Sequence, residues 1–509
     1  MSESSDQSID DAKPEADGEF EARLEAVLVH QLPGCESLIS TERLSGGASQ
    51  ETYRLLIKDT DSPSGQRELA IRRATGGVKT STSELGYPGI ATEAMLMQYA
   101  RAAGVPEPEI YYVLTETDGL GEGFIMEWLE GEALGARIVR SKQFDAIRPT
   151  LAYECGKAMA RIHNIDLGAT GLAQELTVIP PANFVQQTWD RYRAFDTAQP
   201  MIDYTARWLL DNLPDNVDSC LVHSDFRNGN FLLTETGITA VLDWELAHIG
   251  DPMRDLGWIC TRSWRFGGAA PVGGFGEYRD LFRGYEEESG RIVDPAHVRF
   301  WEVFGSFWWS VGCLGMAQQY RSGPDRTVER PAIGRRSSEC QVDCVNLLIP
   351  GEVALIPMPI SSETKDLPRA DELLSSVRDY LRQQVMEATA GRLNFLARVA
   401  ANSLDIVQRE MAIGSEHLAQ EESRLQQFFD SEDNLFNLRW RLVQGLRDGS
   451  IELGSHELQA HLRQTVVNRV AIDQPGYAGF KQATGDECDT CINSDVKAAT
   501  IEPHRDANE

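Results

Sequence analysis

The chain has 509 residues, 42% of them hydrophobic, and a formal net charge of −30 at pH 7. Because this charge repels other polyanions, we expect neither nucleic acid nor an anionic membrane as a partner. No apolar run approaches the roughly 20 residues of a membrane span, and the polar, acidic residues 1–18 predict no signal peptide.

The cysteines indicate the compartment. There are 9 of them, an odd count without a secretory context, which predicts reduced thiols in a cytoplasmic protein. Cys340/Cys344 and Cys488/Cys491 have metal or redox spacing, but no nearby His or Cys completes a four-ligand set. We therefore interpret them as incidental thiols.

The first part of the chain mixes helical and strand-like segments. Residues 1–18 predict a disordered tail. Apolar residues at helical spacing predict a helix over 20–32, which ends at Pro33-Gly34. The segments that follow are strand-like runs at 52–57, 69–73 and 124–126, and helical runs at 90–103, 152–163 and 298–320.

Residues 221–245 carry the main chemical signal. Two apolar runs, 231–233 and 238–242, flank the polar residues 234–237, where Gly237 favours a β-hairpin. Antiparallel pairing would bring Asn230 beside Asp243 at the hairpin base, and two such oxygen ligands suit Mg²⁺. Asp225 follows a short apolar run on a polar loop, from which it could orient a substrate hydroxyl and take its proton.

A single Asp or Asn in a turn is usually a cap or turn residue. The joint pattern H-x-D-(x4)-N, hairpin, D-W-E favours chemistry over that interpretation. Residues 223–230, HSDFRNGN, and 242–252, LDWELAHIGDP, resemble the aminoglycoside phosphotransferase (choline kinase-like) superfamily. More narrowly, they resemble the phosphotransferase-like domains associated with acyl-CoA dehydrogenases.

The resemblance covers about residues 20 to 350. It implies an α+β, bilobal protein-kinase-like fold, with an antiparallel sheet and a helix in the N-lobe and a mainly helical C-lobe. It also implies ATP and Mg²⁺ as cofactors. The roles that it implies are catalysis by Asp225, metal binding by Asn230 and Asp243, and support by His223 and Asp255.

The nucleotide site that the resemblance implies draws on four segments. The ATP phosphates would be covered by a loop made of Ser45, Gly46, Gly47, Ala48 and Ser49. Arg72 would take the place of the usual Lys, with Glu93 as its partner. The backbones of Glu127 and Leu129 would bind adenine. Arg is longer and planar, and Arg73 next door leaves the register of Arg72 open.

The implied activity is transfer of the γ-phosphate to a small-molecule hydroxyl, with a hydroxyacyl-CoA, such as a 4-hydroxyacyl-CoA, as the favoured acceptor. Arg227, Arg262, Trp264 and Arg265 are the candidate substrate residues, and five Arg between 321 and 336 could receive CoA phosphates. Two alternatives stay open. One is an aminoglycoside or choline kinase, and the other is a non-catalytic nucleotide-binding scaffold, since Ser224 and Arg72 depart from the superfamily norm.

The last third of the chain has a different pattern. Apolar residues at 3.6-residue spacing over 373–381, 393–411, 435–446 and 458–470 predict a small all-α bundle. It resembles a bacterial helical domain of unassigned function, and we expect a packing or regulatory module for a protein partner or self-association. The predicted boundaries are a disordered tail at 1–18, N-lobe at 19–130, C-lobe at 131–350, linker at 351–369, bundle at 370–474 and disordered acidic tail at 475–509.

Overall fold

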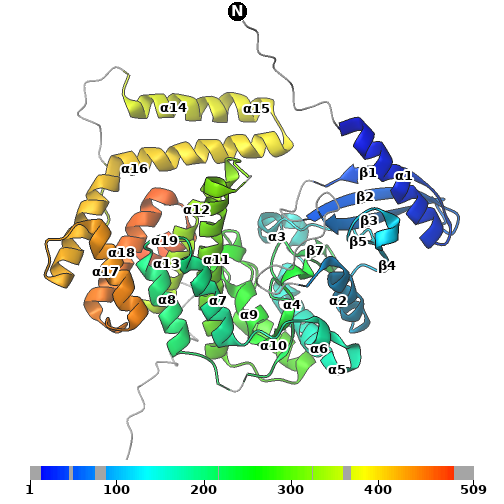
Figure 1. Ribbon diagram of the computed structural model, residues 1–509, viewed down its shortest axis with the longest axis horizontal. Helices are drawn as coiled ribbons and strands as arrows, with labels where there is room; N and C mark the ends of the chain where they lie inside the picture. The colour runs from blue at the N-terminus through cyan, green and yellow to red at the C-terminus, as the bar shows by residue number, and fades with distance from the viewer. Residues whose placement is uncertain are drawn as a thin grey trace, which may run out of the picture. The chain divides into compact units, whose positions relative to one another are not determined.

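The computed structural model describes residues 13–44, 50–74, 88–215, 217–323, 325–358 and 368–485 (Figure 1). The chain forms two compact units. Unit 1 comprises the described residues of Met1–Ile179, Asp218–Ile259 and Phe275–Ile292, and unit 2 those of Pro180–Val217, Cys260–Gly274 and Val293–Glu509. None of the described helices has the length and apolar character needed to cross a membrane.

An antiparallel sheet with strand order β1-β2-β3-β5-β4 begins unit 1. Its strands are β1 Cys35–Arg43, β2 Gln50–Asp59, β3 Gln66–Ala74, β4 Ile110–Val113 and β5 Gly123–Glu127. The strands predicted over 52–57, 69–73 and 124–126 are thus confirmed. Helix α1 (Lys13–Gln31) lies beside this sheet (Figure 1). Its Leu24 and Leu28 share one core with Leu55 and Ile71 of the sheet, because residues four apart lie on one face of a helix.

Helix α1 begins earlier than the sequence predicted. The structure places residues 13–18 in the helix, where we expected a disordered tail. Pro14 is tolerated in the first turn because that turn needs no N–H from it. The polar composition of this segment concealed the helix.

The rest of unit 1 is mainly helical. Its elements are α2 Ile90–Ala102, α3 Gly135–Arg140, α4 Arg148–His163, α5 Leu167–Thr170, α6 Leu172–Glu175, α9 Met253–Cys260, α10 Tyr278–Ser289, and the short strands β6 Cys220–Val222, β7 Phe231–Thr234, β8 Gly237–Val241 and β9 His248–Gly250. Helices α4 and α10 approach closely at two glycines. A Cβ on Gly156 would lie 2.2 Å from the Leu281 carbonyl oxygen, and one on Gly284 would lie 2.1 Å from that of Tyr153, so neither position accepts a side chain.

Unit 2 is built from helices. They are α7 Pro181–Arg193, α8 Pro200–Asp211, α11 Pro295–Ser322, α12 Glu329–Arg335, α13 Ser337–Leu348, α14 Ala370–Tyr380, α15 Met386–Ala388, α16 Gly391–Phe429, α17 Leu435–Asp448, α18 His456–Asp473 and α19 Ala478–Thr484. The helices predicted over 298–320 and after residue 370 are confirmed, although α16 extends 18 residues beyond the predicted end at 411.

The helices after residue 370 share a core with earlier helices. Met201 and Tyr204 of α8 and Val342 of α13 pack in one cluster with Leu442 of α17 and Val467 of α18. The compact units therefore do not divide at the segment that we predicted to be a linker. A polar contact also joins these parts: buried Asp203 accepts hydrogen bonds from Trp189 (2.8 Å) and from Arg447 Nε (2.7 Å).

Helix α19 lies in the segment that we predicted to be a disordered acidic tail, so that prediction is wrong for residues 478–484. Three polar contacts hold it: Tyr477 Oη donates to Asp343 Oδ2 (2.6 Å), Asn346 Nδ2 to the Gly479 carbonyl (2.8 Å), and Arg463 Nη2 to the Ala483 carbonyl (2.9 Å). The acidic composition after residue 486 dominated the sequence-based prediction, whereas these anchors lie far away in sequence.

The buried carboxyl of Asp343 predicts a pH dependence. Burial raises its pKa from 3.8 to about 7, so the folded state binds a proton there that the unfolded state does not bind between about pH 4 and 7. Wild type should therefore lose stability as pH rises through this window. Asp343→Asn stays neutral, so we expect its unfolding free energy to match that of wild type near pH 4 and to exceed it above pH 7 by up to about 4 kcal/mol. Thermal unfolding at both pH values tests this, and a variant that is less stable than wild type at pH 8 would contradict it.

Candidate active site

The predicted β-hairpin is present. Strands β7 and β8 pair antiparallel with Phe231 opposite Val241, and the Leu242 N–H donates to the Asn230 carbonyl (2.7 Å). Asn230 and Asp243 therefore meet at the hairpin base. Asp243 has a φ of 72°, a left-handed conformation that non-glycine residues rarely adopt and that often marks a functional site.

Asp225 lies on the loop between β6 and β7, and its residue is only 8% exposed. Three donors hold its carboxylate. Oδ1 accepts from Trp258 Nε1 (2.6 Å) and Arg227 Nε (2.9 Å), and Oδ2 accepts from Asn230 Nδ2 (2.5 Å). The structure thus brings the predicted catalytic residue into contact with one predicted metal ligand.

Asp255 of α9 binds the backbone of this loop. It is fully buried, and its oxygens accept the backbone N–H groups of His223 (2.8 Å) and Ser224 (2.6 Å) and lie 3.0 Å from His163 Nε2. Burial raises the pKa of Asp255, but the hydrogen bonds from His163 and from the backbone N–H of His223 oppose it, and the pKa is lowered overall. These contacts support the predicted bracing role.

His223 links the loop to the hairpin. Its Nδ1 accepts the Asp225 N–H (3.2 Å), and its Nε2 lies 3.1 Å from the Leu242 carbonyl, which requires the Nε2–H tautomer. Burial lowers the pKa of His223, so the ring is neutral near pH 7. It therefore fixes geometry and carries no charge.

The structure resolves the register of the two arginines in β3. Arg72 Nη2 lies 2.5 Å from Asp243 Oδ1 and 3.5 Å from Glu93 Oε2, whereas Arg73 pairs with Glu51 (3.0 Å) and stacks on Phe20. Burial lowers the pKa of Arg72, but Glu93 and Asp243 outweigh it and raise the pKa. Arg72 therefore joins the sheet, α2 and the hairpin base.

Gln50 is a residue of this network that the sequence did not reveal. Its Nε2 donates to Glu93 Oε1 (2.8 Å), and its Oε1 accepts from Arg72 Nε. Burial raises the pKa of Glu93, although Arg72 and the Gln50 hydrogen bond oppose this. No motif marks Gln50, and only the pairing of β2 with β3 places it there.

The residues at the hairpin base fit a divalent cation. The amide nitrogen of Asn230 is used by Asp225, and the Asn230 Oδ1 has no hydrogen-bond partner among the described residues. With a carboxylate from Asp243, this is a pair of hard oxygen donors of the kind that Mg²⁺ accepts alongside phosphate and water. The described residues contain no cluster of three or more His, Cys, Asp or Glu that could hold a metal.

The predicted adenine-binding segment follows β5. The Glu127 N–H donates to the Glu109 carbonyl (2.8 Å), so this N–H is already used within the protein. The Leu129 backbone makes no hydrogen bond to another described residue. The predicted phosphate loop, Ser45 to Ser49, lies outside the described residues.

The candidate acceptor residues in the 3₁₀ turn η5 (Arg262–Arg265) make internal contacts of unit 2. Arg265 Nη2 donates to Glu302 (2.8 Å), Arg262 lies 3.5 Å from Asp343, and the Trp264 ring packs 5.5 Å from that of Trp309. Within the arginine-rich segment, Arg330, Arg335 and Arg336 likewise have carboxylate partners. Because their charge is compensated within the protein, these contacts do not favour a phosphate-binding role.

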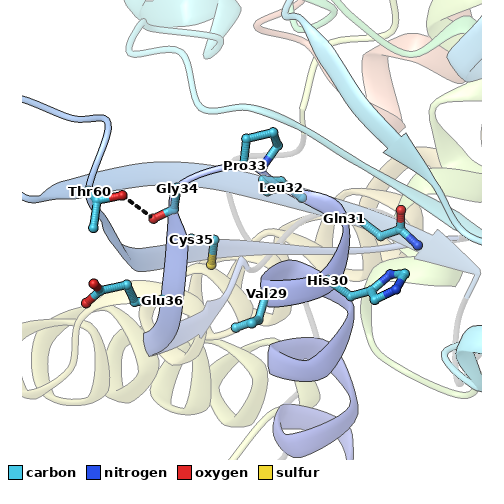
Figure 2. A pocket seen from close by; sticks show the side chains of 9 residues that line it. All are labelled: Val29, His30, Gln31, Leu32, Pro33, Gly34, Cys35, Glu36 and Thr60. Atoms are coloured by element: carbon cyan, nitrogen blue, oxygen red, sulfur yellow. Dashed lines mark hydrogen bonds between the residues drawn. The ribbon is translucent and has the colours of Figure 1, made fainter.

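A cavity of about 340 Å³ lies at the turn from α1 to β1 (Figure 2). It is lined by residues 29–36 and Thr60, whose hydroxyl donates to the Gly34 carbonyl (3.3 Å). None of the predicted site residues lines it.

Comparisons with known sequences identify families for two parts of the chain. Residues 40–291 match the Phosphotransferase enzyme family, so the chain contains a domain of that family, as the resemblance predicted. Residues 387–477 match a domain of unknown function (DUF6285).

Two curated relatives match the chain. Acyl-CoA dehydrogenase family member 10 of Mus musculus is 29% identical over 226 residues, which are 42% of this chain and 19% of the relative. Acyl-CoA dehydrogenase family member 11 of Gallus gallus is 28% identical over 246 residues, which are 46% of this chain and 30% of the relative. The chain thus spans less than a third of either relative.

A solved structure shows the fold. A protein of Ralstonia eutropha assigned to the aminoglycoside phosphotransferases superposes with a TM-score of 0.51 and 22% identity, over 63% of this chain and 95% of that one. Together with the antiparallel sheet and the helices that follow it, this confirms the predicted α+β, kinase-like fold with additional C-terminal helices.

Proposed function

We propose that the protein is an ATP- and Mg²⁺-dependent phosphotransferase that moves the γ-phosphate to a hydroxyl of a small molecule. The observation that carries this proposal is the cluster at the hairpin base, where Asp225 contacts Asn230 and where Asp243 lies within ion-pair distance of Arg72. A bound Mg²⁺, held by Asn230 and Asp243, would neutralise charge on the transferred group.

The transfer forms a bond between the acceptor oxygen and the γ-phosphorus and breaks the bond to the bridging oxygen of ADP. Asp225 accepts the hydroxyl proton and orients the acceptor oxygen. Arg72, held by Glu93 and Gln50, offers its positive charge to the phosphates. Positioning and charge compensation supply most of the acceleration, because the transferred group is nearly metaphosphate-like.

The acceptor that we favour is a hydroxyacyl-CoA. The likeness to two relatives named as acyl-CoA dehydrogenase family members supports this choice. ADP release assayed with a 4-hydroxyacyl-CoA, an aminoglycoside and choline, each with and without Mg²⁺, tests it. Turnover of the CoA ester is expected. Turnover of an aminoglycoside or choline alone would exclude the CoA ester, and ATP binding without transfer even to water would favour a scaffold.

Arg72 has a matched control next to it. Lys has one ammonium in place of a planar fork and cannot reach Asp243, Glu93 and Gln50 together. We expect Arg72→Lys to lower kcat/KM for ATP about tenfold, equivalent to about 1.4 kcal/mol. Arg73→Lys, whose side chain meets Glu51 and Phe20, should stay within about twofold of wild type on the same scale. Equal losses in both variants would argue against the role of Arg72.

We also propose a cytoplasmic location and an interaction surface on α14. None of the seven described cysteines forms a disulfide, in keeping with reduced thiols. Helix α14 lies along α16 (Figure 1), and its Leu373, Val377 and Tyr380 are more than half exposed. An assay of molar mass in solution distinguishes a single chain from a self-associated one.

A further inference from the structure

Helix α9 contacts the loop of Asp225 through more than its bracing carboxylate. Besides Asp255, it presents Arg254 and Trp258, which are 0% and 1% exposed. Trp258 Nε1 donates to Asp225 Oδ1 at 2.6 Å. Nothing in the roles assigned above uses this indole.

The ring of Trp258 is fixed in place by its neighbour. The Arg254 guanidinium carbon lies 4.3 Å from the centroid of the Trp258 ring, and Arg254 Nη2 donates to the Ser224 carbonyl (3.2 Å). A cation over an indole face is attracted by the ring quadrupole. The Ser224 carbonyl, the Arg254 guanidinium and the Trp258 indole therefore form a continuous chain of contacts that ends at the Asp225 carboxylate.

The donors divide unequally between the two carboxylate oxygens. Oδ1 accepts two N–H groups, from Trp258 and Arg227, whereas Oδ2 accepts one, from Asn230. Each carboxylate oxygen offers about two lone-pair sites. Oδ1 is therefore saturated, and Oδ2 keeps a site for one more hydrogen.

We propose that Trp258 is a positioning residue for phosphoryl transfer, whose N–H holds Oδ1 of Asp225 so that Oδ2 accepts the acceptor hydroxyl. This inference rests on the proposed function, because it assigns the working oxygen of the same site. The proton leaves the acceptor oxygen for Oδ2 as the new O–P bond forms, and ADP departs with the electron pair of the broken bond.

The test compares two buried Trp–Asp pairs. Trp258→Phe removes the N–H that reaches Asp225, and Trp189→Phe removes an equivalent N–H to buried Asp203 in unit 2 (2.8 Å), far in sequence from the proposed site. A 3-benzothienylalanine at position 258 keeps the shape of the indole and lacks only the N–H, which covers the case in which Trp258→Phe fails to fold.

We expect both changes at position 258 to lower kcat about ten- to hundredfold, with KM for ATP within about twofold of wild type. Trp189→Phe should lower the melting temperature and leave kcat within about twofold of wild type. An unchanged kcat in the position-258 variants, or an equal loss of kcat in Trp189→Phe, would overturn the proposal.

An NMR measurement distinguishes failure of the positioning role from failure of the proposed function. The indole ¹H–¹⁵N resonance of Trp258, assigned by its loss in Trp258→Phe, should move in Asp225→Asn whether or not the chain turns over any acceptor. A wild-type chain that transfers phosphate to nothing would end the proposed function. If the chemical shift of the Trp258 indole is the same in Asp225→Asn as in wild type, the positioning role of Trp258 is contradicted.

Discussion

Replacing Asp225 with Asn is expected to lower kcat for phosphoryl transfer by about two to four orders of magnitude, the contribution of a positioned general base. The amide cannot take the hydroxyl proton. It also places an NH₂ group among the three donors that now point at the carboxylate, from Trp258, Arg227 and Asn230. Both effects act on the acceptor side of the reaction.

The affinity of Asp225→Asn for Mg²⁺-ATP should change less than its kcat. If the NH₂ of the new amide faces Asn230 Nδ2, the two donors repel each other and the Asn230 side chain rotates. Because Asn230 is a proposed Mg²⁺ ligand, we expect the Kd for Mg²⁺-ATP to rise, but by less than about tenfold, which is about 1.4 kcal/mol. Calorimetry measures this Kd, and coupled ADP release measures kcat. Glu235→Gln, an exposed change in the hairpin turn, is the matched control and should leave both values near wild type. An Asp225→Asn enzyme with wild-type kcat would remove Asp225 from the mechanism.

The sequence predicted the parts of the site that a local pattern specifies. The gap at 234–237 and the apolar runs beside it define the hairpin, and the hairpin alone brings Asn230 and Asp243 together. Gln50 and Trp258 could not be identified in this way. Gln50 needs the pairing of β2 with β3, and Trp258 sits on a short helix where an apolar ring is normally a core residue.

The same limit explains the errors in the C-terminal part. Composition separated residues 350–369 and the acidic tail from the helices, because Pro-rich and acidic segments have few local contacts. It could not show that Leu442 packs with Met201, or that Tyr477 reaches Asp343 across 134 positions. It also could not show that the candidate substrate residues Arg262 and Arg265 have Asp343 and Glu302 as partners.

The second large effect is expected from Asp255→Ala, on stability. This change leaves three buried donors without an acceptor: the N–H groups of His223 and Ser224, and the ring of His163. Removing one partner of such a buried charged network costs about 3–5 kcal/mol. We expect a matching shift of the unfolding midpoint in urea, and Asp218→Asn, an exposed change on the segment before β6, should shift it by less than about 0.5 kcal/mol.

The pH dependence separates loss of the charge at position 255 from loss of packing. The folded-state pKa of Asp255 is lowered, so its stabilising contribution is present above the unfolded-state pKa of about 4 and is lost as pH falls below that value. The stability difference between wild type and Asp255→Ala should therefore be constant from pH 8 to 5 and shrink below about pH 4. A difference that stays constant at low pH would mean that Asp255 acts through its volume alone. In that case the loop of Asp225 would have to owe its shape to His223 and the hairpin instead.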